Sequence, residues 1–231
     1  MPTTQTVSFP SASGQLFGYF ARPEGAGPFP GVVVIHEAFG LNDDIRAITR
    51  RFTEVGYAAL AVDLFGGRNR VLCMFRLLGG MLFNSLEHGG IRDLRAALDF
   101  LANQPGLDNH RLGAIGFCMG GGLAIAWACT DDRLAAIAPF YGMNPRPLEA
   151  VKRACPVVGS YPEKDFTAGA GRKLEEKLSE YKIPHDIKIY PGAHHSFFTA
   201  GRSHDEAAAQ DAWNRVLSFF AQHIKKETDP I

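Results

Sequence analysis

Hydrophobic and polar positions alternate along the chain between short apolar runs and longer segments with a helical period. Residues 31–35 form an uninterrupted apolar run, typical of a strand that is buried on both faces of a sheet. After this run, Ile45, Ile48 and Phe52 share one stripe of a helix that Asn42 or Asp43 would cap. Further strands are predicted at residues 57–62, 111–117, 134–141, 156–161 and 185–190, and further helices at 91–103, 121–129, 171–181 and 205–224.

Strands and helices that alternate in this way favour right-handed crossovers and a mostly parallel sheet with helices on both faces. No repeat or linker-like segment divides the 231 residues, so a single α/β domain over residues 1–231 is predicted. Residues 65–88 fit the alternation poorly, and we expect a helical excursion over one end of the sheet there. Residues 225–231 are expected to form a polar C-terminal tail.

The composition narrows the class of partner. The chain has 24 basic and 24 acidic residues, and its zero net charge argues against a dedicated surface for nucleic acid or anionic membrane. The first residues lack the basic and apolar regions of a signal peptide. The uncharged residues 112–130 contain five glycines, which favours a strand, a tight turn and a buried helix over a membrane span. We therefore expect a cytoplasmic protein with no nucleic-acid or membrane partner.

The four cysteines are too widely spaced for a zinc motif and too few for a disulfide framework. His36 and Glu37 begin like the zinc motif H-E-x-x-H, but Gly40 stands where the second histidine would be. No metal and no cofactor are therefore expected.

Four chemically capable side chains follow predicted strands: Glu37, Cys118, Asp165 and His195. Because ligands bind at the carboxyl ends of the strands in open α/β sheets, these four are the candidate site residues. A carboxylate directly after a buried strand, such as Glu37, costs several kcal/mol unless it has partners. The alternative for Glu37 is an ordinary surface carboxylate.

The strongest local signal is the segment GFCMG at residues 116–120, between a predicted strand and a predicted helix. It has the G-x-nucleophile-x-G form of a nucleophile elbow, with Cys118 where serine is commoner. Gly116 and Gly120 provide the close approach that such a sharp turn needs, and the helix N-terminus favours a thiolate. The alternative is that Cys118 is an ordinary small buried residue.

A nucleophile of this type needs a base, and the base needs an orienting group. Elbow hydrolases place the nucleophile, the acid and the histidine in that chain order, which Cys118, Asp165 and His195 satisfy. His194 is the rival base. Taken alone, Asp165 would be a solvent-facing turn residue.

Three segments, GFCMGG (116–121), HEAFG (36–40) and GAHHSF (192–197), together resemble the dienelactone hydrolase family. The resemblance extends from YFARP at residues 19–23 to the last predicted helix. It implies an α/β-hydrolase fold and a Cys–His–Asp triad, with Glu37 paired to the resting thiol. By motif matching it assigns the nucleophile to Cys118, the base to His195, the acid to Asp165, and the oxyanion hole to the backbone N–H groups of Met119 and Ala38.

One position departs from the family pattern. Members that act on chlorocatechol derivatives carry a substrate-binding arginine four residues after the catalytic histidine, where this chain has Thr199. The nearest arginine is Arg202. Weaker candidates for binding a substrate anion are Arg68, Arg70 and Arg76, and candidates for an apolar pocket are Phe39, Phe65, Phe75, Phe197 and Phe198.

The expected substrate is a small ester or lactone. Thiolate leaves a tetrahedral intermediate more readily than an ordinary alkoxide, which favours enol and aryl esters, whose leaving oxygen is stabilised by resonance. Two alternatives stay open, namely a cysteine enzyme of the glutamine-amidotransferase type and a non-catalytic α/β-hydrolase scaffold that only binds ligands. The oligomeric state is not predicted.

Overall fold

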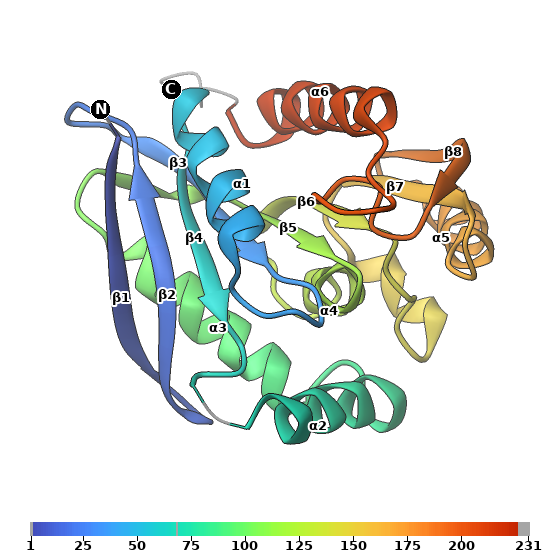
Figure 1. Ribbon diagram of the computed structural model, residues 1–231, viewed down its shortest axis with the longest axis horizontal. Coiled ribbons are helices and arrows are strands. Elements are labelled where there is room, and N and C mark those ends of the chain that lie inside the picture. The colour runs from blue at the N-terminus through green and yellow to red at the C-terminus, as the bar shows by residue number, and fades with distance from the viewer. Residues whose placement is uncertain (1, 68, 226–231) are drawn as a thin grey trace.

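Eight strands form one sheet in the order β1-β2-β4-β3-β5-β6-β7-β8 (Figure 1). The computed structural model describes residues 2–67 and 69–225. The strands are β1 (Thr3–Ser11), β2 (Gly14–Arg22), β3 (Phe29–Ile35), β4 (Ala58–Asp63), β5 (Leu107–Phe117), β6 (Leu134–Phe140), β7 (Val157–Lys164) and β8 (His185–His194). β1 pairs antiparallel with β2 and β2 with β4, and all other pairs are parallel. The mostly parallel α/β sheet predicted from the sequence is confirmed.

Helices cover both faces of this sheet. They are α1 (Asp43–Glu54), α2 (Arg70–Phe83), α3 (Gly89–Ala102), α4 (Met119–Ala128), α5 (Ala168–Glu180) and α6 (Glu206–His223), with a 3₁₀ helix at Leu148–Arg153. α1 and α6 lie over one face, where Phe52 and Trp213 pack in one apolar cluster. α3, α4 and α5 cover the other face, and their apolar side chains form the second cluster. The sheet is therefore buried in its centre, which explains the continuous apolar runs of the inner strands.

The β1–β2 hairpin was not among the predicted elements. The residues of β1 are mostly polar and exposed, and only Phe9 among them is buried. An edge strand that contributes so little to the core carries a weak hydrophobic pattern, so this part of the sheet cannot be recognised from periodicity alone.

Residues 65–88, for which a helical excursion is predicted, contain α2. This helix lies at the lower edge of the molecule in Figure 1 and buries only Cys73 and Leu77 fully. Within the described ranges, no helix combines the length and the apolar character needed to cross a membrane. The predicted C-terminal tail lies outside the described residues, except for Lys225.

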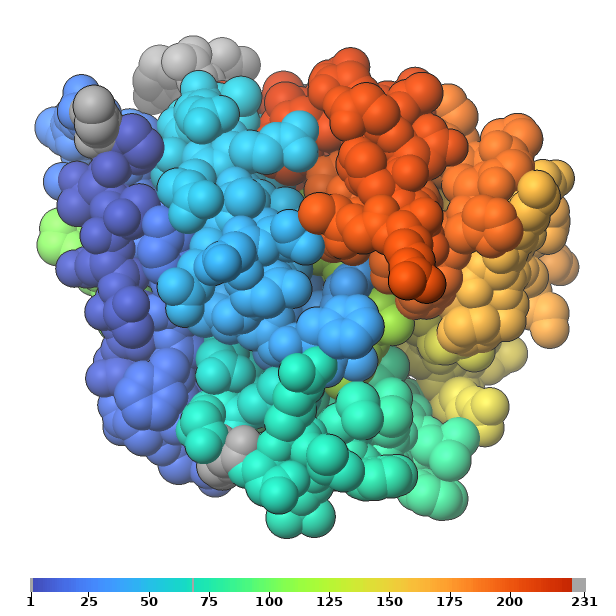
Figure 2. All heavy atoms as spheres, in the orientation of Figure 1, coloured from blue at the N-terminus to red at the C-terminus, as the bar shows by residue number. Residues whose placement is uncertain are grey.

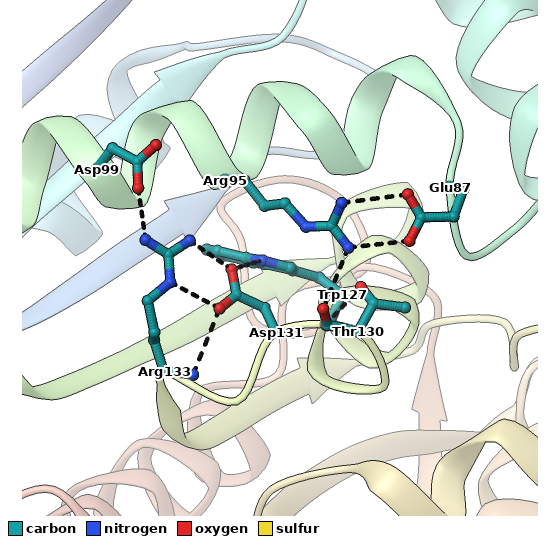
Figure 3. Close-up of polar contacts among 7 residues, drawn as sticks. All are labelled: Glu87, Arg95, Asp99, Trp127, Thr130, Asp131 and Arg133. Carbon is teal, nitrogen blue, oxygen red and sulfur yellow. Dashed lines mark hydrogen bonds and ion pairs between the residues drawn. The ribbon is translucent and has the colours of Figure 1, made fainter.

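A polar network ties the C-terminal end of α4 to α3 (Figure 3). The indole Nε1 of Trp127 donates to Asp131 Oδ2 at 3.0 Å, and Arg133 binds both Asp131 and Asp99 of α3. Nearby, Arg95 donates to the carbonyl oxygen of Thr130 at 3.1 Å. These bonds fix α4, whose N-terminus lies beside Cys118.

Candidate active site

Cys118 occupies the sharp turn between β5 and α4. Its backbone has φ 53° and ψ −114°, which is a strained conformation for a residue with a side chain. The amide of Cys118 donates to the carbonyl oxygen of Phe140 at 3.0 Å, which anchors the turn to β6. The side chain is partly exposed, so the turn presents its sulfur at the carboxyl edge of the sheet.

The glycines around this turn are required by close backbone contacts. A Cβ atom at Gly116 would overlap the carbonyl oxygen of Gly120, and a Cβ atom at Gly120 would overlap the carbonyl oxygen of Ile35. Any side chain at either position would push the turn away from the neighbouring strands. The local sequence therefore specifies the elbow geometry.

His195 lies just beyond the end of β8 and Asp165 just beyond the end of β7. The ring Nδ1 of His195 is 2.7 Å from Asp165 Oδ2. The Asp165 side chain is only 4 % exposed, and Thr167 Oγ1 donates to the same carboxylate oxygen. His194 makes no such contact among the described residues, so the structure brings His195, rather than His194, against Asp165.

The side chain of Cys118 forms a hydrogen bond with the ring of His195. The hydrogen bond between Cys118 and His195, followed by the Asp165 carboxylate, raises the pKa of His195 to about 9, against the lowering effect of burial. Since Nδ1 is engaged with Asp165, Nε2 is the nitrogen available to the thiol. A proton on this ring is therefore stabilised from both sides, by the sulfur and by the carboxylate.

Glu37 is buried and accepts hydrogen bonds from three hydroxyl groups on one oxygen. Tyr141, Ser196 and Thr199 donate to Glu37 Oε1 at 3.0, 3.1 and 3.5 Å. Burial raises the pKa of the Glu37 carboxyl, although these bonds and the charge of His195 act in the opposite direction. These three hydrogen bonds offset part of the free-energy cost of burying a carboxylate directly after a buried strand.

His36 fixes the backbone on which Glu37 and Ala38 lie. Its Nε2 accepts from the Leu64 amide at 3.1 Å, so Nδ1 carries the proton and donates to the Glu37 carbonyl oxygen at 2.6 Å. Burial lowers the pKa of His36, which keeps the ring neutral. Arg70 donates twice to the Ala38 carbonyl oxygen, at 3.0 and 2.8 Å. This loop is held rigidly next to the elbow.

The backbone N–H groups of Ala38 and Met119 have no acceptor within the part of the chain that the structure describes. Met119 is the first residue of α4, where a helix leaves its N–H groups free. Two unpaired donors near Cys118 can bind a developing negative charge.

The weaker pocket candidates divide into two groups. Phe39 and Arg202 line a pocket of about 360 Å³ that Glu37 and His195 also border. Arg76 instead donates to Ser13 Oγ at 2.6 Å and does not line this pocket. Phe197 is fully buried against Tyr190 and belongs to the core, which is where such an aromatic ring gains most free energy.

The remaining candidates are placed as follows. Arg70 lies over the ring of Phe39, with 5.6 Å between the guanidinium carbon and the ring centroid. Phe65 and Phe198 are buried, whereas Phe75 is exposed on α2. Arg68 lies outside the described residues.

Two aromatic residues of the site were missed by sequence reasoning. Tyr141 packs its ring 4.8 Å from that of His195, and Phe166 stacks on His195 at 5.6 Å with 12° between the ring planes. Tyr141 directly follows β6, so the rule that identified the four candidates after strands would have found it with a strand boundary one residue earlier. Phe166 had no signal beyond its position next to Asp165.

No group of three or more metal-binding side chains occurs in residues 2–67 and 69–225.

Comparison with known proteins identifies relatives along almost the whole chain. Residues 16–224 match the model of the dienelactone hydrolase family. A protein of Saccharolobus solfataricus, provisionally named a carboxymethylenebutenolidase, is 34% identical over 95% of this chain and 98% of its own length. A protein of Escherichia coli K12 with the same provisional name is 30% identical over 96% of this chain and 88% of its own.

Solved structures agree with these matches. A provisionally named dienelactone hydrolase from Klebsiella pneumoniae has a TM-score of 0.84 at 28% identity and covers 96% of this chain and 100% of its own. P91, a dienelactone hydrolase-like promiscuous phosphotriesterase from metagenomic libraries, has a TM-score of 0.85 at 27% identity, with 96% and 98% covered. An acylaminoacyl peptidase of Pyrococcus horikoshii, 16% identical with a TM-score of 0.77 over 100% of this chain and 43% of its own, shares the α/β-hydrolase fold.

Proposed function

This chain belongs to the dienelactone hydrolase family and is a hydrolase, and from that premise we propose that it cleaves activated esters and enol lactones with Cys118 as nucleophile. His195 acts as base and acid, and Asp165 orients its ring. The substrate is a small-molecule ester or lactone.

The observation that carries the proposal is the position of His195 between sulfur and carboxylate. Its Nδ1 is 2.7 Å from a nearly unexposed Asp165, and its pKa is raised to about 9 by Cys118 and Asp165. A ring held in this way can take the thiol proton on Nε2 and return it to a leaving group.

In the first half-reaction the thiolate of Cys118 attacks the ester carbonyl carbon, and the carbonyl electrons move onto oxygen. The N–H groups of Ala38 and Met119 receive that oxyanion, and such a donor contributes about 3–4 kcal/mol in comparable sites. The carbon–oxygen bond to the leaving group then breaks, which leaves a thioester on Cys118. His195 gives its proton to the departing oxygen, which leaves as the enol, phenol or alcohol, and the ring is then neutral.

In the second half-reaction His195 takes a proton from water, and the resulting hydroxide attacks the thioester. The carboxylic acid product leaves and the thiolate is restored. The atoms and electrons of both half-reactions are supplied by the ester, by water and by the side chains named above.

Sulfur as nucleophile restricts the leaving group. A thiolate is expelled from the tetrahedral intermediate more easily than an alkyl alkoxide, so simple alkyl esters mostly return to substrate. An enolate or a phenolate competes because its charge is delocalised. Equal turnover of ethyl esters and enol esters by the wild-type enzyme would contradict this preference.

We assign Glu37 the role of holding the thiol in its resting state. Its buried carboxylate is a hydrogen-bond acceptor close to the elbow, and Tyr141, which donates to it, also lies in the electrostatic field of Cys118. A neutral thiol bound in this way resists oxidation better than an exposed thiolate.

The test compares a carboxylated dienelactone with an uncharged enol ester, using Cys118→Ala as the blank. Turnover of either substrate that depends on Cys118 supports the proposal. The absence of turnover above the blank, together with no alkylation of Cys118 by iodoacetamide in the native protein, would make the ligand-binding scaffold the better account. Cys129 serves as an internal control, because burial raises the pKa of its thiol to about 12.

A further inference from the structure

A second pocket of about 360 Å³ lies next to the proposed triad. The loop after β6 and the segment that leads into α5 form its walls, and the two segments are far apart in the sequence. Phe166 links this pocket to the site, because its ring both lines the pocket and stacks on His195. α5 and the segment before it are exposed along the right-hand edge of Figure 2, so a ligand can reach this part of the surface.

The charged residues in the lining of this pocket are Arg146 and Lys173. Both are exposed, and neither forms an ion pair with a carboxylate among the described residues. The pocket beside Glu37 differs, because Glu37 and Asp44 line it together with Arg202 and His195. Charges of both signs therefore border that pocket, whereas the charged side chains bordering the pocket at Phe166 are both cationic.

The loop that carries Arg146 is fixed before any ligand arrives. The buried Ser85 hydroxyl donates to the Arg146 carbonyl oxygen at 2.7 Å and accepts from the Arg146 amide at 2.8 Å. Asn144 Nδ2 donates to the carbonyl oxygen of Ala170 at 2.9 Å, which ties this loop to α5. Such bonds reduce the conformational entropy that ligand binding would otherwise cost.

The pocket also presents apolar surface beside its cations. Phe166 is 75% exposed and Met143 45%, and Leu148 lines the pocket with them. Exposed large apolar side chains next to unpaired cations suit a ligand that combines an apolar body with an anionic end.

We propose that this pocket is a subsite for the carboxylate end of the ester substrate, with the carboxylate at Arg146 and Lys173 and the apolar body against Phe166 and Met143. The inference rests on the proposed function, because the ester group must reach Cys118. It places a substrate anion away from the carboxylates of Glu37 and Asp44. The chain thereby accepts carboxylated esters although Thr199 supplies no cation.

The test uses ester pairs that differ only in charge. On the acyl side, the mono-4-nitrophenyl esters of adipic and suberic acid are compared with 4-nitrophenyl hexanoate and octanoate. On the leaving-group side, 4-acetoxybenzoate is compared with 4-acetoxybenzamide. For each pair the readout is kcat/KM for the anionic ester divided by kcat/KM for the neutral ester.

In the double variant Arg146→Ala/Lys173→Ala we expect this ratio to fall about fivefold or more in at least one pair, since an exposed ion pair contributes roughly a twofold to fivefold effect. Salt at 1 M should lower the wild-type ratio but leave that of the variant nearly constant, because the screening length is then about 3 Å. Arg172→Ala is the matched control: it removes one cation from the same helix outside the pocket and should keep the wild-type ratio.

A ratio that stays within about 1.5-fold of the wild type in every pair would overturn the proposal. If no ester is hydrolysed through Cys118, the proposed function has failed, and the subsite is then tested by binding alone. For this, calorimetry measures adipic acid mono-4-nitroanilide, a stable amide, against Cys118→Ala with and without the double substitution. At least fivefold weaker binding with the double substitution supports the subsite, and equal binding refutes it.

Discussion

Asp165→Asn removes the negative charge next to His195 and leaves a side chain of nearly the same shape. In the wild type, His195 Nδ1 lies 2.7 Å from Asp165 Oδ2, and the aspartate side chain is only 4% exposed. An asparagine there can offer its NH₂ group to Nδ1. The ring would then carry its proton on Nε2 and could not accept one from Cys118, which is the tautomer problem known for such triads.

The direction of the effect follows from the pKa of His195. Cys118 and Asp165 raise this pKa from 6.5 to about 9, with Cys118 as the larger source. Asp165→Asn removes one of these two sources, so we expect the pKa of His195 to fall. Because the ring also takes the wrong tautomer, we expect kcat/KM to fall by about 10²-fold to 10⁴-fold.

Two measurements check this expectation. The first is kcat/KM for an enol ester between pH 5 and 10, whose alkaline limb reports loss of the His195 proton in the free enzyme and should shift to lower pH. The second is an NMR titration of the His195 ring proton. Asp132→Asn, an exposed aspartate beside the buried Asp131, serves as the control and should leave both curves unchanged.

The same substitution has a signed effect on stability. Because the pKa of His195 is raised in the folded state, its interactions stabilise the fold fully below pH 6.5 and lose this effect as the pH rises through about 9. Asp165→Asn should therefore lower the free energy of unfolding more at pH 6 than at pH 10. An unchanged His195 titration, with kcat/KM within twofold of the wild type, would refute the role assigned to Asp165.

Two further substitutions test the elbow and the buried carboxylate. Gly120→Ala should lower the free energy of unfolding by about 3 kcal/mol or more in urea denaturation, because its Cβ meets the carbonyl oxygen of Ile35. The control is Gly79→Ala, whose Cβ has open space in α2 and which should raise the free energy of unfolding by about 0.5–1 kcal/mol. Similar values for both variants would contradict the contact argument. Burial raises the pKa of Glu37, so its contribution to stability is present below pH 4.5 and is lost as the pH rises through the folded-state value. Glu37→Gln should accordingly become more stable relative to the wild type between pH 4.5 and pH 7, and a pH-independent difference in urea midpoint would count against a buried ionisable group.

The elbow could be predicted from the sequence because its geometry is set by neighbours in the chain. Gly116, Cys118 and Gly120 lie within five residues, and the contacts that require glycine involve the turn itself and the adjoining strand β3. The order of Cys118, Asp165 and His195 added a second constraint that is independent of side-chain direction. Local chemistry and chain order together led to the group of residues that the structure brings together.

Side-chain direction, in contrast, depends on how distant segments pack. Phe197 is only two residues from His195, yet Ser196 between them has φ 63°, and the chain turns so that Phe197 enters the core. Arg76 faces Ser13 of the β1–β2 hairpin, an element that the hydrophobic pattern did not predict. The direction of neither side chain could be predicted without knowing which segment packs against it.

The charge of the two pockets near His195 also could not be predicted from the sequence, because it depends on which segments pack together. Glu37 and Asp44 lie on one pocket and Arg146 and Lys173 on another, and the second pair comes from two different segments, the loop after β6 and α5. The net charge of zero hides this separation, because it averages acidic and basic surfaces over the whole chain. The proposed chemistry depends on a turn that the sequence encodes locally. In our proposal, the charge of the accepted substrate depends instead on how the loops after β6 and β7 pack together. Replacing residues in those loops should therefore change the preferred substrate without altering the nucleophile.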